Sequence, residues 1–70
     1  MKNRECKILL KKEVENIDNT KTILEVVFIE RAWNYFESNY DYFLVLIKGN
    51  QRFERKIDRE EGKELWEATK

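Results

Sequence analysis

The dipeptide Gly49-Asn50 limits the possible folds of this chain more than any other part of its sequence. It separates segments 40–48 and 51–57, which are rich in β-branched and aromatic residues and are therefore typical of strands. Glycine supplies the positive φ that a two-residue hairpin loop needs. The two segments are thus predicted to form an antiparallel hairpin.

The length of this loop also predicts the register of the hairpin. The predicted pairs are Lys48 with Gln51, Leu46 with Phe53, Leu44 with Arg55, and Tyr42 with Ile57. Alternate residues of a strand lie on the same face. One face therefore gathers apolar side chains, which are Tyr42, Leu44, Leu46, Phe53 and Ile57.

Two more strands are predicted upstream. Segment 6–14 alternates in part, with a predicted core face made of Cys6, Ile8, Leu10 and Val14. A turn is expected at residues 17–20, where Asp and Asn favour turn conformations. Segment 22–33 is apolar on both faces, as in an interior strand, but residues 29–37 also have helical spacing. Two structures are therefore possible here: a strand that continues to about residue 33, or a short helix over residues 29–37.

The last element is predicted to be a helix that begins after Asp58. Asp58 is a good N-cap, and Glu61 completes a capping-box-like pair with it. Glu60 and Glu61 place negative charge at the positive end of the helix dipole. Gly62 costs helix stability, which is explained if its missing side chain lets the helix lie close to the sheet.

These elements predict one small domain over residues 1–70 with the order ββββα. The fold class is α+β, a four-stranded antiparallel meander with one C-terminal helix packed on one face. A chain of 70 residues buries a limited core, and neither a disulfide nor a histidine-containing zinc site can support it. The core must suffice by itself, or a partner must complete it.

The composition argues against catalysis. The chain has no histidine and one cysteine, so it lacks a Ser–His or Cys–His pair. Cys6 is expected to be a small buried hydrophobe, and Glu60-Glu61 to be dipole-matched charge rather than a metal site. We expect no enzyme activity, no cofactor and no metal. The unpaired cysteine and the lack of a membrane-length apolar run favour a cytoplasmic protein without membrane contact.

An aromatic cluster with acidic residues and no lysine or arginine spans residues 33–43. Its candidate protein-binding residues are Trp33, Tyr35, Phe36, Glu37, Tyr40, Asp41 and Phe43, to which Ile47 is added from the same strand. Tyrosine and tryptophan are enriched at binding hot spots. The alternative is that these rings serve core and loop packing.

The second face of segment 40–48 is also apolar. Phe43, Val45 and Ile47 point away from the predicted helix, where a solvated face would be polar. Either they form an exposed apolar stripe for interaction, or the N-terminal segment or long Arg and Lys stems cover them.

Two functions are compatible with these patterns. The first is a non-enzymatic protein-interaction module, such as a small inhibitor, adaptor or subunit, of viral or mobile-element type, that binds another protein or itself as a homodimer. The alternative is a nucleic-acid-binding domain that uses a basic strip on the fourth strand, made of Lys48, Arg52, Arg55 and Lys56. The formal net charge of zero counts against nucleic acid.

Overall fold

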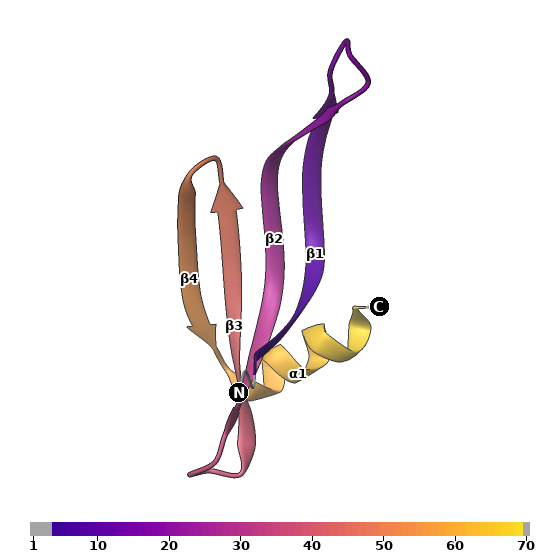
Figure 1. Ribbon diagram of the computed structural model, residues 1–70. Coiled ribbons are helices and arrows are strands. Elements are labelled where there is room, and N and C mark those ends of the chain that lie inside the picture. Colours follow the sequence, from indigo (N-terminus) through magenta and orange to yellow (C-terminus); the bar gives the residue numbers. More distant parts are fainter. Residues whose placement is uncertain (1–3, 70) are drawn as a thin grey trace.

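The computed structural model describes residues 4–69 as one antiparallel sheet followed by a helix (Figure 1). The elements are β1 (Arg4–Glu15), β2 (Lys21–Asn34), β3 (Asn39–Lys48), β4 (Gln51–Ile57) and α1 (Arg59–Ala68). The strands lie in the order β1-β2-β3-β4, so each pairs with its neighbour in sequence. The predicted ββββα architecture is confirmed. No helix among the described residues has the length and apolarity needed to cross a membrane.

The hairpin β3–β4 has the predicted register. Lys48 pairs with Gln51 across the loop, and the pairs continue to Tyr42 with Ile57. Gly49 has a φ of 60°, a conformation that glycine adopts without strain. The turn between β1 and β2 is likewise where the sequence predicts it, and Asn19 takes a positive φ of 68° there.

Of the two structures possible for residues 29–37, the strand is the correct one as far as Asn34. β2 extends to Asn34 and pairs with β3 along this whole region, so the short helix over residues 29–37 does not form. Ile29 is fully buried at the centre of β2. Both edges of β2 find partners, which satisfies its backbone groups and overrides the helical spacing.

The predicted core face of β1 is wrong in its first half. Register shifts lie between Ile8 and Leu10, and between Lys12 and Glu13. A bulge residue moves the side chains that follow it to the other face. Leu10 therefore lies on the side of the sheet that the helix covers, whereas Cys6 and Ile8, which precede the bulge, lie on the opposite side. Cys6 is exposed, and Lys7 pairs with Ile29 on the covered side.

Helix α1 packs on β3 and β2, with Gly62 and Trp66 as its buried residues. A Cβ atom at Gly62 would lie 2.3 Å from Cβ and Cγ of Tyr42, so the predicted close approach is confirmed. Asp58 is the N-cap residue, but its side chain makes no capping hydrogen bond, so the predicted capping interaction is absent.

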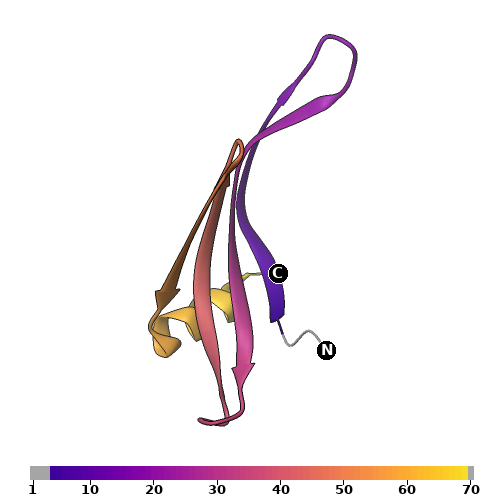
Figure 2. The same ribbon diagram turned by 60° about the vertical axis from the view of Figure 1, so that its left-hand side comes forward.

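The helix covers only one end of the sheet. We call the covered side, with Ile29, Tyr42 and Ile57, the helix face, and the opposite side, with Phe43 and Val45, the back face. The views in Figures 1 and 2 place α1 near the β2–β3 turn, whereas the β3–β4 loop and the end of the β1–β2 hairpin extend away from it. The opposite end of the helix face therefore lacks a second layer.

Candidate functional site

The acidic-aromatic segment forms the end of β2, a turn and the start of β3. Asn34 shapes the turn, because its Oδ1 accepts the backbone N–H of Phe36 at 3.0 Å and of Glu37 at 3.2 Å. This Asx-type geometry points the next side chains outward. Tyr35 is 70% exposed and Phe36 is fully exposed at the tip.

Trp33 and Tyr40 belong instead to the packing of the helix face. Their rings meet edge to face at 4.9 Å. The Arg31 guanidinium lies over Tyr40 at 4.2 Å and over Trp66 of the helix at 4.3 Å. Cation–π contacts of this kind join the aromatic residues of the sheet to those of the helix. The alternative of structural packing therefore applies to Trp33 and Tyr40.

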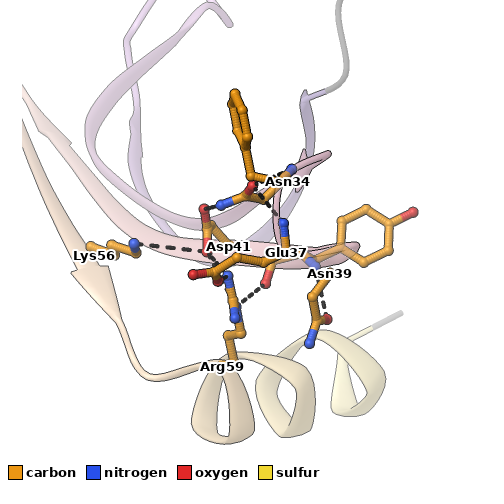
Figure 3. Close-up of polar contacts among 8 residues, drawn as sticks. Asn34, Glu37, Asn39, Asp41, Lys56 and Arg59 are labelled. Atoms are coloured by element: carbon orange, nitrogen blue, oxygen red, sulfur yellow. Dashed lines mark hydrogen bonds and ion pairs between the residues drawn. The ribbon is translucent and has the colours of Figure 1, made fainter.

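The two acidic side chains of the segment bind cations of this same chain (Figure 3). Arg59, the first residue of α1, donates to Asp41 Oδ1 from Nε at 3.2 Å and from Nη2 at 2.8 Å, and it also pairs with Glu37. Lys56 Nζ lies 3.7 Å from Asp41, and Asn34 donates to the other carboxylate oxygen. The network attaches the helix N-terminus to the β2–β3 turn.

This network changes the acidity of its members. The hydrogen bond from Arg59 is the main cause that holds the pKa of Asp41 below its ordinary value, with help from Asn34 and Lys56. Hydrogen bonds to Asp41 and Glu37 raise the pKa of Arg59 in turn. The carboxylates are thus compensated within the chain, and their expected steering of a basic partner is correspondingly weaker.

The back face is covered by charged side chains. Val45 is fully buried, while Phe43 and Ile47 are partly buried. Arg4 and Arg52 each pair with both Glu30 and Glu54, at 3.1 to 3.4 Å, and form a ring of four alternating charges. The Arg4 guanidinium also lies 5.2 Å from the centre of the Phe43 ring. Val45 therefore fits the alternative in which long charged side chains cover this face. Phe43 lies partly beneath Arg4, and Ile47 keeps part of its surface exposed.

The predicted basic strip of β4 divides between the two faces. Lys48 and Arg55 lie on the helix face, and Arg52 and Lys56 lie on the back face, as their pairing positions require. Arg52 and Lys56 are moreover paired with carboxylates. The structure does not bring the four cations together on one surface.

An apolar surface lies on the uncovered end of the helix face. We call it the open apolar surface, and it consists of Leu10, Val27, Leu44, Leu46 and Phe53. A groove of about 360 Å³ runs along it, with Glu25 and Arg55 at its sides. Leu10 is 47% exposed and Phe53 is 53% exposed. Apolar side chains that share one face and remain this exposed are typical of an interaction surface.

Sequence reasoning placed three of these residues on one face but expected the helix to cover them. A helix of ten residues is about 15 Å long, whereas a strand of ten residues is about 33 Å long. The helix is too short to cover the whole strand, and this difference in length could have predicted the open apolar surface from the sequence. Leu10 was harder to place, because its face depends on the bulge in β1.

The remaining candidate groups form no site. Cys6 is exposed, and within residues 4–69 no group of three or more His, Cys, Asp or Glu residues is arranged to hold a metal ion. Comparison with known proteins gives no further indication of function, since no protein-family model, no curated protein and no solved structure matches this chain.

Proposed function

We propose that this chain is a protein-interaction module that binds a partner protein through the open apolar surface. The observation that supports this is the groove lined by Val27, Leu44, Leu46 and Phe53 on a sheet face that is covered elsewhere. A sheet face with an apolar surface is stable when a second layer packs on it. At the other end of the same face that layer is α1.

The partner element that fits this surface is an amphipathic helix. The chain's own helix shows how such an element packs here, with Leu65 and Trp66 directed at the sheet and charged residues on its outer side. Recognition of an amphipathic helix through its apolar stripe is a common mode of protein binding. Glu25 and Arg55 line the groove, and since Glu25 is paired with Lys12, Arg55 is the charge that would orient the bound helix.

The acidic-aromatic turn takes a secondary place in this proposal. Tyr35 and Phe36 are the exposed aromatic residues of that segment, and they lie at the far end of the molecule from the groove. In this proposal, Tyr35 and Phe36 would make additional contacts with a partner large enough to reach both ends of the molecule. No observation favours nucleic acid, because the four residues of the predicted basic strip, Lys48 of β3 and Arg52, Arg55 and Lys56 of β4, do not share a face.

Two apolar residues of β1 provide a matched test. Leu10 is 47% exposed and pairs with Val27 on the helix face, whereas Ile8 is 57% exposed and pairs with Phe28 on the back face. We expect Leu10→Glu to abolish capture of the partner from cells of the source organism, and Ile8→Glu to retain it. Binding constants are then measured with the purified partner.

The two variants have similar exposure, so they control for a general effect of a new carboxylate. If a specific partner binds wild type and Leu10→Glu equally well, the open apolar surface is not its docking site. A partner that is lost with Ile8→Glu alone would place the site on the back face instead.

A further inference from the structure

The outer edge of β4 is the second unpartnered feature of the fold. β4 is a terminal strand of the sheet, and α1 leads away from it across β3 and β2 (Figure 2). The other terminal strand, β1, has two register shifts in its pairing with β2. Bulges are devices that protect an edge from pairing, and the β3–β4 register is continuous without a bulge.

The backbone groups that β4 presents outward can be identified from its hairpin. Residues that flank a two-residue loop bond to each other, so Lys48 and Gln51 form a hydrogen-bonded pair. Hydrogen-bonded and non-bonded pairs alternate along an antiparallel ladder. Arg52 and Glu54 therefore direct their N–H and C=O groups away from β3, toward the free edge.

We propose that two copies of this chain form a homodimer through antiparallel pairing of their β4 strands, centred on Phe53. A two-fold axis perpendicular to the sheet places residue i of one copy opposite residue j of the other, and j opposite i. The axis then passes through one residue pair. Centred on Phe53, this pairing puts Arg52 of each copy opposite Glu54 of the other.

The neighbouring registers are disfavoured by charge. Centring on Glu54 would place two carboxylates together at the axis and would set Arg52 against Lys56 twice. Centring on Arg55 would place two guanidinium groups together at the axis. Like charges directly opposite destabilise a strand pair, whereas opposite charges and aromatic pairs stabilise it. The Phe53 register has both favourable kinds of pair.

The proposed pairing also agrees with the hydrogen bonding and with the surface. Arg52 and Glu54 would exchange backbone hydrogen bonds with their counterparts, because both point outward. Phe53 would meet its counterpart in a non-bonded pair, in which side chains approach more closely. Phe53 is 53% exposed in the single chain, and the contact would shield it and join the two open apolar surfaces.

The inference goes beyond the proposed function and does not depend on it, since its test needs only this chain. Wild type is expected to sediment as a weak dimer whose fraction rises from micromolar to millimolar concentration. Arg52→Glu makes both cross-pairs acidic and Glu54→Arg makes both basic. Each variant alone is expected to raise the dimer Kd by roughly 10-fold.

A mixture of the two variants is the decisive sample. In a mixed dimer, the carboxylate introduced at position 52 of one copy would face the guanidinium introduced at position 54 of the other. The second cross-pair would keep the native Glu54 opposite the native Arg52, so association is expected to recover. The matched controls are Lys63→Glu and Glu64→Arg, which make the same charge changes on exposed positions of α1. A mixture that stays monomeric, or a wild-type chain that is monomeric throughout, would overturn the proposal.

Cross-linking tests the register without altering the charges. In a Cys6→Ser background, Phe53→Cys places two thiols opposite each other at a Cα separation of about 4.5 Å, which a disulfide can span. Gln51→Cys and Arg55→Cys each face a different residue and are expected to cross-link far more slowly under the same oxidant. Equal rates at the three positions would exclude the Phe53-centred pairing.

Discussion

Gly62 shows how a single missing side chain places the helix. The backbone of α1 lies so close to Tyr42 that a Cβ atom at Gly62 would overlap the tyrosine side chain. Tyr42 is only 4% exposed and packs with Ile29, Ile57 and Trp66, so it has little freedom to move aside. The helix therefore packs closely because of this residue, at the expense of intrinsic helix propensity.

We expect Gly62→Ala to lower the free energy of unfolding by about 1 to 3 kcal/mol, the range for overpacked cores. Propensity acts in the opposite direction and would by itself raise stability by about 1 kcal/mol. Urea unfolding followed by tryptophan fluorescence measures the difference, with Lys63→Ala on the exposed side of α1 as the control. An unchanged or higher stability for Gly62→Ala would contradict the close packing.

The Asp41–Arg59 pair predicts how stability depends on pH. The pKa of Asp41 is lowered in the folded chain, so this carboxylate stabilises the fold above its unfolded pKa of about 3.9. The contribution is lost as the pH falls through the lower folded pKa, when Asp41 becomes protonated. Below pH 4, Asp41→Asn is therefore expected to lose less stability on acidification than wild type does.

The measurement is urea unfolding at a series of pH values between neutrality and pH 2. Asp18 also has a lowered pKa, through hydrogen bonds from Thr20, so part of the acid sensitivity remains in the Asp41→Asn variant. Glu64→Gln, a change on the exposed side of α1, is the control. Parallel curves for wild type and Asp41→Asn would show that the Arg59 contact does not stabilise the fold.

At the scale of elements, β1 supplies the charge that α1 lacks at its C-terminus. The last turn of α1 contains no basic residue. Lys7 of β1 donates from Nζ to the carbonyl oxygens of Trp66 at 3.0 Å and Thr69 at 2.9 Å, and its ammonium lies 4.7 Å from the centre of the Trp66 ring. A cation at this end of a helix is favourable for both the unpaired carbonyls and the dipole.

We expect Lys7→Met to reduce the free energy of unfolding by about 1 kcal/mol, because methionine keeps an apolar stem but removes the charge. Hydrogen exchange of the amides of α1 should accelerate more than that of β3. Lys11→Met is the matched control, since Lys11 is exposed and pairs with the neighbouring Glu13. Equal effects of the two substitutions would argue against the contact between Lys7 and the helix end.

At the scale of the whole molecule, the β1–β2 hairpin extends beyond the rest of the sheet. β3 pairs with β2 only from Glu25 onward, so residues 21–24 have β1 as their single neighbour. Figure 1 shows this ribbon projecting from the sheet. Its apolar side chains are exposed, and Ile17 at the tip is fully so. An isolated pair of strands is marginally stable in water.

The ribbon is therefore expected to open locally, without unfolding of the sheet. In hydrogen exchange, the amides of residues 13–23 should exchange faster than those of residues 25–31, which belong to the same hairpin but lie between β1 and β3. Mild trypsin treatment should cut first at Lys21. Equal protection of the two parts of the hairpin would show that the ribbon is stabilised by something other than its own pairing.

Local patterns were enough to predict most of the fold. The register of β3 and β4, the order of the elements and the close approach at Gly62 all depend on residues near each other in the chain or on one side chain. The site was less predictable. Tyr35 and Phe36 are exposed, whereas Trp33 packs on the helix face. Glu37 and Asp41 are bound by Arg59, and Phe43 lies beneath Arg4.

The sequence by itself determined the strands, their pairing and the position of the helix, because turn chemistry and side-chain alternation act over a few residues. Only the tertiary structure decided which surfaces are covered. The bulge in β1 put Cys6 and Leu10 on opposite faces, so that Lys7 rather than Cys6 lies toward the helix, and charged side chains from distant strands cover Val45 on the back face. Which surfaces are covered depends on contacts between residues far apart in the sequence, and local sequence patterns do not encode such contacts.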